Sequence, residues 1–520
     1  METSRHLREK SDSLTCMEAI SAIFLTEIPE EDWAKTPESV KKLVQKLIER
    51  IGAFEEDYQH LQEQVQRNSK NSSQPPSQDQ RKGFAPKASA SKGSRARGAQ
   101  KGHEGHEQRL YPAEECRRIE EHYPSHCCEC GQALAGVDES PQRIQLIDIP
   151  PLHPIVDEHR FHALECPCCG VVTRAYDAEI VDGSRYGVRL CALVGLLSGE
   201  YRQSHRMVVR LLAELYEIEV SVGSVGRMRQ EVSEAVAHPV AEAQAYVQQQ
   251  GQVNVDETSF AQGNADGNNP TAKKGWLWVV VTPLVCFFQV LLSRSQQAAQ
   301  DILGAGFAGF VTSDRCGAYN WLAIEQRQVC WAHLKRDFTK IAERPGISGA
   351  LGAALLKQQE QLFELWYQIR DGTLERTEFI EKVAPIRQQV KELLSEGASY
   401  PIADGEKTPL AKTVRTCQQL LKVEPAFWLF VTVAGIEPTN NAAEQAIRPA
   451  VLWRRSSYGS QSAAGSLFVA RMLTVVTTLR RQQRNVLEYL TEACQAKRQG
   501  RLAPSLLPLP NPTNAVLPVT

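Results

Sequence analysis

The stretch Gln-Val-Asn-Val-Asp-Glu-Thr, residues 252–258, has the pattern of a short strand that ends in two acids, the first of which is Asp256. The stretch Gly-Phe-Val-Thr-Ser-Asp, residues 309–314, has the same form and ends at Asp314. Most acids on a protein simply face water, so an acid at the end of a buried apolar strand is a better candidate for chemistry. These two stretches therefore predict both a sheet and a candidate site at one end of it.

Three more strand patterns accompany these two, and they lie at 276–281, 285–292 and 327–331. Three sequential strands, a helix, a fourth strand and further helices form the order of a ribonuclease-H-like α/β core. In such a core the first and fourth strands are neighbours, so Asp256 and Asp314 are expected to lie side by side. Residues 351–394 are charged, helical in pattern and without strand signals, which indicates a helical domain inserted into this core.

A third acid, Glu444, follows in the second part of the core. Thr439 or Asn440 can cap a helix that carries Glu444 and Arg448 on one face, four residues apart. Magnesium prefers hard oxygen ligands and keeps positions for water or phosphate. Two Mg²⁺ or Mn²⁺ ions held ~4 Å apart by Glu444 and the two strand acids would activate an attacking oxygen and stabilise a leaving one. The three acids therefore predict a metal-dependent nuclease.

The cysteines predict a second kind of metal. Two knuckles of the same form, Cys-Cys-Glu-Cys-Gly at 127–131 and Cys-Pro-Cys-Cys-Gly at 166–170, are typical of a zinc ribbon with one structural Zn²⁺. In each knuckle the Cys-x-x-Cys pair that ends directly before Gly supplies the ligands, which are Cys127, Cys130, Cys166 and Cys169. The spare thiols Cys128 and Cys168 are alternates, and buried free cysteines are the plainer interpretation.

Two segments before the knuckles have no strand pattern. In the first, apolar residues recur at steps of three and four, which favours a coiled coil over a single amphipathic helix. Its seam is Val40, Leu43, Leu47, Ile51, Phe54, Tyr58, Leu61 and Val65. The second, residues 67–101, is rich in Ser, Gln, Gly and cations, as in a solvated linker. Its cations, among them Arg95, Arg97 and Lys101, should also attract DNA phosphates without sequence preference.

A helical block lies between the knuckles and the first strand. One helix pattern covers 206–216, and a second helix, capped by Ser221, carries Arg227 and Arg229 on its expected surface. Helix, short turn and helix with exposed arginines resembles a helix-turn-helix, in which such arginines reach base edges. An ordinary helical hairpin gives the same pattern and is the alternative.

The chain has 520 residues, too many for one hydrophobic core, so a multidomain protein is expected. The predicted order is a helical, coiled-coil region (1–66), a basic disordered linker (67–109), a zinc ribbon (110–182), a helix-turn-helix-like region (183–245), the α/β core in two parts (246–344 and 426–500) around the helical insertion (345–425), and a disordered tail (501–520).

Composition narrows the class of protein. Hydrophobic residues make up 42%, charged residues 23%, and the net charge is −2, as in a soluble globular protein. No secretory pattern opens the sequence, and the most apolar stretch, 276–292, is interrupted by Thr282 and Pro283 and is short for a membrane span. We therefore expect a cytoplasmic protein with no membrane partner.

The chain from the knuckles to Cys494 resembles transposases of the insertion-sequence 66 family. The similar motifs, in the family's order, are Val255-Asp256-Glu257-Thr258, Lys274-Gly275-Trp276-Leu277-Trp278, Ser313-Asp314 with Gly317-Ala318-Tyr319, Cys330-Trp331-Ala332-His333-Leu334-Lys335-Arg336-Asp337-Phe338, and Thr439-Asn440-Asn441-Ala442-Ala443-Glu444 with Ile447-Arg448-Pro449. Gln445 stands where the family often has Arg, and Arg455 stands where Lys is frequent.

The resemblance implies a D-D-E transposase in which Asp256, Asp314 and Glu444 are the catalytic metal ligands. Such an enzyme would cleave and transfer DNA strands at the ends of a mobile element, at the bacterial nucleoid. Its partners would be double-stranded DNA (terminal repeats and target), further copies of itself and accessory transposition proteins. A catalytically silent DNA-binding regulator and a nuclease of RNA–DNA hybrids are the alternatives. Loss of an acid would favour the regulator, and all three acids are present.

Cys330-x-x-His333 resembles a motif that several cut-and-paste transposase groups carry between the second and third acids. Two ligands make half a metal site, and the sequence shows no partners for them. We interpret Cys330 as a packing residue and His333 as a phosphate or base contact. Arg448 and Arg455, which follow Glu444, are further candidates for DNA contacts.

Overall fold

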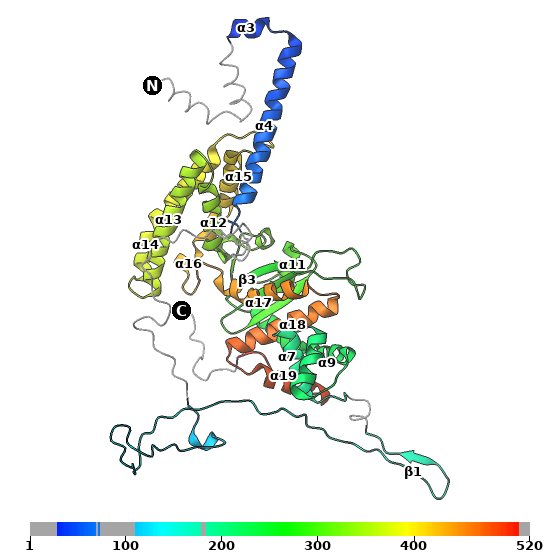
Figure 1. Cartoon of the computed structure of the whole chain (residues 1–520). Helices are drawn as coiled ribbons and strands as arrows, with labels where there is room; N and C mark the ends of the chain where they lie inside the picture. Colours follow the sequence, from blue (N-terminus) through cyan, green and yellow to red (C-terminus); the bar gives the residue numbers. More distant parts are fainter. Residues whose placement is uncertain (1–28, 69–70, 73–109, 178–183, 509–520) are drawn as a thin grey trace.

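The computed structural model describes residues 29–68, 71–72, 110–177 and 184–508 (Figure 1). The predicted phosphate contacts Arg95, Arg97 and Lys101 lie outside the described residues, as do residues 509–520 of the predicted tail. The first part of that tail is ordered, contrary to expectation. Leu506 is fully buried in the main core, and the Tyr489 hydroxyl donates to the Pro504 carbonyl at 2.6 Å.

Five strands form one mixed sheet in the order β5-β4-β3-β6-β7. The strands are β3 (Gln252–Ser259), β4 (Trp276–Val281), β5 (Cys286–Leu291), β6 (Phe310–Ser313) and β7 (Arg327–Val329). The β3–β4 and β4–β5 pairs are antiparallel, whereas β6 runs parallel to both β3 and β7. All five predicted strands are confirmed, to within two residues at each end.

Helices cover the sheet (Figure 1). Those of this part of the chain are α7 (Val188–Gly199), α8 (His205–Tyr216), α9 (Val222–Ala235), α10 (Ala237–Gln248), α11 (Gln296–Leu303), the 3₁₀ turns η2 (Gly317–Tyr319) and η3 (Ile324–Gln326), α17 (Asn441–Ser457), α18 (Ala463–Arg481) and α19 (Val486–Arg498). Helix α17 contacts β3 and β4, and α18 contacts β5. Residues 277–281 of β4 are buried without alternation, so both faces of the sheet are covered. The protein is therefore a mixed α/β protein.

Two buried threonines of α18 cover β5, which is an edge strand. The Phe288 N–H donates to Thr474 Oγ1 at 2.9 Å, and the Cys286 N–H donates to Thr478 Oγ1 at 3.0 Å. An open edge would leave backbone groups unpaired, and these side chains satisfy them. By length and composition α18 could cross a membrane, but 56% of it is buried inside the protein, as expected for a core helix.

The segment between the two parts of the sheet region is helical, as predicted. It contains α13 (Ile347–Arg370), α14 (Arg376–Ser399) and α15 (Pro409–Lys422), which share a second hydrophobic core with α12 (Trp331–Ala342), the 3₁₀ helix η4 (Glu424–Phe427) and α16 (Leu429–Thr432). Buried Trp331 lies in this core with edge-on ring contacts at 5.1 to 6.5 Å to Phe338, Phe363, Phe427 and Trp428.

Gln328 of β7 ties the returning chain to the sheet. Its amide Nε2 donates to the Phe427 carbonyl at 3.1 Å, and its Oε1 accepts the Phe430 N–H at 2.9 Å. Gln328 is fully buried, so these bonds satisfy an amide that has no access to water. The chain therefore leaves the sheet after β7, folds the insertion, and comes back beside β7 just before α17.

Helices α8 and α9 occupy the predicted helix-turn-helix region. Ser221 caps α9 as predicted, since its Oγ accepts the Ser224 N–H at 3.0 Å, and Arg227 is exposed. The expectation that Arg229 is exposed is wrong. Its guanidinium contacts the ring of His205 and lies over the Phe468 ring, 4.1 Å from the centroid, because this side of α9 packs against α18. Burial lowers the pKa of Arg229 to about 10.

The predicted seam lies on a single helix, α4 (Glu38–Gln66), which follows the short helix α3 (Glu30–Lys35). The side chains of the eight seam residues are exposed, from 43% at Val40 to 75% at Phe54. An amphipathic helix that lay on its own protein would bury this face. The seam is thus an apolar helical stripe, open to solvent in the single chain (Figure 1).

We predict opposite effects of the same substitution at two helical glycines. A Cβ added to Gly352 of α13 would lie 2.1 Å from the Ala342 nitrogen of α12, so Gly352→Ala should push the two helices apart. We expect a loss of roughly 1–3 kcal/mol of stability, seen as a lower Tm. Gly226 of α9 has open space around it, so Gly226→Ala should leave Tm unchanged or raise it. Equal shifts of Tm in the two variants would contradict this packing.

Candidate catalytic site

Asp256 and Asp314 lie on two adjacent parallel strands. Asp314 directly follows β6, as predicted, but the prediction that the first strand ends at its acids is wrong, because β3 continues in its pairing with β4 as far as Ser259. Asn254 of β3 is paired with Thr312 of β6, and each acid follows its member of this pair by two residues. Side chains two residues apart share a face of the sheet, and neighbouring strands are only about 4.8 Å apart. The register therefore places the two acids level with each other on neighbouring strands, and the charge of Asp314 acts on Asp256.

Asn440 attaches the third acid to the same place. Its Nδ2 donates to the Val255 carbonyl at 2.8 Å, and its Oδ1 accepts a hydrogen bond from Asn254 at 3.0 Å. The Asn440 carbonyl in turn accepts the Glu444 N–H at 3.0 Å, which begins α17. Asn440, one of the two caps expected from the sequence, does occupy the N-cap position of α17, but its side chain binds β3 instead of the free N–H groups of the helix. Glu444 lies in the first turn of α17, where the helix dipole favours a carboxylate.

The acids at this site repel one another. Burial, followed by the charges of Glu257, Asp314 and Glu444, raises the pKa of Asp256 well above its usual value. The Glu444 Oε1 atom is buried and has no hydrogen-bond partner among the described residues. A cation held between these groups would remove the repulsion. The site therefore fits a hard metal ion.

A second buried acid, Glu257, is held by an arginine and a tyrosine that sequence reasoning missed. Arg294 Nη2 lies 2.6 Å from Glu257 Oε1, and the Tyr319 hydroxyl donates to Glu257 Oε2 at 2.5 Å. The same Arg294 nitrogen lies 3.5 Å from Asp314 Oδ2. Burial, and then the charge of Asp314, raises the pKa of Glu257. The arginine therefore contacts both acids. Glu257 and Tyr319 each belong to a motif of the transposase family, whereas Arg294 belongs to none of those motifs.

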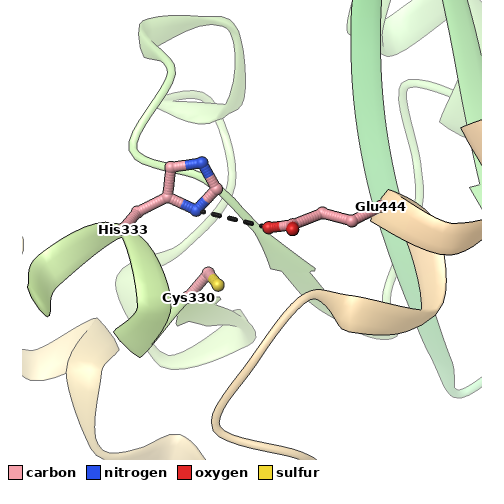
Figure 2. Close-up of side chains that lie close together, drawn as sticks. All are labelled: Cys330, His333 and Glu444. Carbon is pink, nitrogen blue, oxygen red and sulfur yellow. Dashed lines mark ion pairs between the residues drawn. The ribbon is translucent and has the colours of Figure 1, made fainter. Parts of the chain in front are cut away.

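His333 and Cys330 lie beside Glu444 (Figure 2). His333 Nδ1 is 3.7 Å from Glu444 Oε1, and Arg336 Nη2 is 3.8 Å from the same oxygen. Burial, followed by the charge of Arg336, lowers the pKa of His333, while burial raises the pKa of Cys330 to about 11. The sequence showed no partner for this motif. The structure supplies one, Glu444, which is 111 residues from His333 in sequence (444 − 333).

Metal-ligating side chains gather in two groups at this site. One group is Cys330, His333 and Glu444, and the other is Glu257, Asp314 and Cys316. In each group the donor atoms lie within 4.8 Å of one another. Arg448 and Arg455 are exposed on α17 beyond Glu444. Arg227 is exposed on α9, whereas Arg229 is packed inside.

The two cysteine knuckles have the same backbone geometry. In the first knuckle, the Cys127 N–H donates to the Gln132 carbonyl, and the Gly131 N–H donates to the Cys127 carbonyl. In the second, the Cys166 N–H donates to the Val171 carbonyl, and the Gly170 N–H donates to the Cys166 carbonyl. Hydrogen bonds from the backbone of Cys130 and Glu129 lower the pKa of Cys127, and those of Cys169 and Cys168 lower the pKa of Cys166. Thiols so placed are suited to metal binding.

The knuckles lie apart in a largely exposed part of the chain. Residues 110–177 contain a 3₁₀ turn (Ala113–Glu115) and one antiparallel pair, β1 (Ala163–Glu165) and β2 (Val172–Arg174), around the second knuckle. Among the described residues, no group of three or more metal-ligating side chains includes a knuckle cysteine. The structure thus shows two half-sites and leaves the four-thiolate site a prediction.

Comparison with known proteins identifies the family of this mixed α/β protein. A family model described as the transposase IS66 family matches residues 183–467, more than half of the chain. The chain belongs to the IS66 family of transposases. A model described as a family of unknown function (DUF6444) matches residues 27–109.

Two proteins of Sinorhizobium fredii are similar to this chain. The uncharacterized protein y4qI is 25% identical over 443 residues, which cover 80% of this chain and 77% of y4qI. The uncharacterized protein y4hP is 27% identical over 195 residues, 34% of each chain. Both similarities agree with the family membership, and neither name describes an activity.

We predict that Asp256→Asn stabilises the metal-free protein. Because the pKa of Asp256 is raised in the folded state, the unfolded chain loses its proton first, and this carboxyl lowers stability as pH rises above about 4. The Tm of the variant should therefore exceed that of the wild type by a few degrees at pH 7, and the gap should close near pH 4. The exposed acid Glu325 provides a control, since Glu325→Gln should produce no such gap. A gap that widens toward low pH would contradict the assignment.

Proposed function

We propose that this protein cleaves DNA strands and transfers them at the ends of a mobile element, with Asp256, Asp314 and Glu444 as the catalytic metal ligands. The observation that carries the proposal is that the charges of Asp314 and Glu444 both act on Asp256. Asp256 and Asp314 lie level on adjacent parallel strands, and Asn440 attaches the start of the helix with the third acid to β3. The membership of the IS66 family supports transposition as the setting for this chemistry.

The order of the sheet supports a ribonuclease-H-like core. Numbered along the sheet region, the strands lie in the order 3-2-1-4-5, with the first three antiparallel and the last two parallel to the first. The helical insertion separates β7 from the helix with the third acid. This is the arrangement inferred from the sequence, and it supports the same class of enzyme.

The chain's own residues would bind and orient the cations and the DNA. Asp256, Asp314 and Glu444 would supply hard carboxylate oxygens for Mg²⁺ or Mn²⁺, which is the chemistry these ions prefer. When bound, two such ions activate the attacking oxygen and stabilise the leaving one. Arg294, 3.5 Å from Asp314 Oδ2, and the Cys316 N–H, which donates to Asp314 Oδ1 at 2.8 Å, orient this carboxylate within the protein itself.

Several further features suit double-stranded DNA and assembly of copies. Exposed Arg448, one turn beyond Glu444 on α17, offers a phosphate contact near that acid, while Arg455 further along α17 and Arg227 on α9 offer contacts farther away. The open seam of α4 suits a second copy of the same helix, as in a coiled-coil dimer. A catalytically silent regulator would share these surfaces, but it would have no need for three acids at one site.

Cleavage should depend on all three acids. We expect DNA nicking at the ends of the element in Mg²⁺ or Mn²⁺ and none in EDTA. Asp256→Ala, Asp314→Ala and Glu444→Ala should each lower the rate by more than 100-fold while binding to DNA persists. Glu325→Ala, a change of an exposed acid just before β7, is the matched control and should cleave normally. Full cleavage by the Asp314 variant would refute the assignment, and binding without cleavage in the wild type would favour the regulator.

We also propose that the two knuckles join around one structural Zn²⁺ held by Cys127, Cys130, Cys166 and Cys169. The matching knuckle geometry and the lowered pKa of the first thiol in each support four thiolate ligands. A structural zinc site supplies folding energy, so residues 110–177 should become compact when it fills.

Metal analysis of the full chain tests this site. The wild type should contain one zinc per chain, and Cys130→Ser or Cys169→Ser should lose most of it. Cys128→Ser, a change of the spare thiol in the same knuckle, is the matched control and should keep it. Loss of zinc in the Cys128 variant would show that the ligands are chosen wrongly. Absence of zinc from wild-type protein purified without chelator would refute the site.

A further inference from the structure

The Cys330-x-x-His333 motif has no role in the metal chemistry described above, yet both residues lie against the element that carries Glu444. Cys330 is fully buried and occupies the N-cap position of α12. Its Sγ accepts the Asn440 N–H at 3.2 Å, and the adjacent Trp331 N–H donates to the Pro438 carbonyl at 2.9 Å. Two bonds thus tie the start of α12 to the chain that leads into α17.

The contacts of the His333 ring determine which nitrogen carries the proton. Arg336 Nη2 lies 3.1 Å from His333 Nε2. A guanidinium has only donors, so Nε2 must be the atom without a proton. In the neutral ring the proton is then on Nδ1, and Nδ1 is the atom that faces Glu444 Oε1 at 3.7 Å (Figure 2).

The facing atoms, His333 Nδ1 and Glu444 Oε1, are both buried and, within the described parts of the chain, neither makes a hydrogen bond. Arg336 Nη2 also lies 3.8 Å from Glu444 Oε1. An approach of ~0.8 Å would give an ordinary N–H···O distance near 2.9 Å. Hydrogen bonds of active sites are often long in the free protein and shorten when the site fills. The two atoms are therefore placed to satisfy each other.

We propose that His333 is a positioning residue for Glu444. Its Nδ1–H holds Oε1 and leaves the other carboxylate oxygen for the cation, Arg336 fixes the tautomer, and Cys330 holds α12 against the start of α17. The inference rests on the proposed function, because it assigns Glu444 to a metal site. In this proposal the Cys-x-x-His motif orients a metal ligand without binding the metal, as outer hydrogen-bond partners do in other metal sites.

The same three side chains could instead bind a soft metal, since their donor atoms lie within 4.8 Å of one another. The hydrogen bonds argue against this. A metal on His333 would need a free lone pair on Nδ1, and Arg336 leaves the ring's lone pair at Nε2 instead. The positioning role uses the groups as they are.

Two substitutions separate the ring atoms. His333→Asn keeps an N–H donor near the position of Nδ1, whereas His333→Gln places its amide near the position of Nε2. The first measurement is the Mn²⁺ affinity of the full-length protein by calorimetry, in which only the binding that disappears in Asp314→Asn is counted. The second is the Mn²⁺ concentration at which cleavage reaches half its maximal rate. We expect His333→Gln to weaken both by about 10-fold or more. His333→Asn should stay within a few-fold of the wild type. Lys335→Gln, an exposed change on the same helix, should leave Mn²⁺ affinity unaltered.

The outcomes distinguish this inference from the proposed function. Equal Mn²⁺ affinity in the Gln and Asn variants, both with wild-type Tm, would overturn the positioning role and leave the three-acid site intact. A wild-type protein that neither binds Mn²⁺ nor cleaves would overturn the proposed function and this inference with it. A second zinc per chain that disappears in Cys330→Ala would show a metal centre and overturn the positioning role. Recovery of affinity in the Asn variant also excludes general misfolding as the cause of the Gln defect.

Discussion

The buried side-chain amide of Asn440 joins the parts of the chain that carry the candidate site. It donates to Val255, accepts from Asn254, and its backbone N–H meets the sulfur of Cys330. Strand β3, helix α12 and the start of α17 therefore meet at one fully buried polar residue. An unsatisfied buried amide is costly, so all three segments have to be in place together. The contacts of Asn440 therefore determine the position of the first turn of α17, which contains Glu444.

The site is built against electrostatic repulsion. Asp256 is close to three other acids, and the protein offsets only part of their charge internally, through Arg294 beside Glu257 and Asp314. A compact fold tolerates such a cluster only because the rest of the core is well packed, which both faces of the sheet and the covered edge at β5 provide. The unrelieved charge is the property that suits the proposed site to a cation.

Sequence patterns predicted what depends on neighbours in the chain and missed what depends on distant ones. The five strands follow from apolar runs of the right length, and the cap of α9 at Ser221 follows from one residue. The inward turn of Arg229 depends on Phe468, and the role of Asn440 depends on β3. Neither has a local signal. The partner of His333 was missed for the same reason, because the insertion separates the two residues in sequence.

The insertion itself explains how such distant residues meet. Helix α12 belongs to both halves of the structure: its first turn contacts the site through Cys330 and His333, while Trp331, Phe338 and Ile341 pack in the second core. Gln328 fixes the returning chain to β7 a few residues before Asn440. The inserted helices therefore close onto the same short helix that supports Glu444. A rigid core of this kind transmits displacement, so the geometry of the third acid is coupled to the packing of the insertion as well as to the sheet.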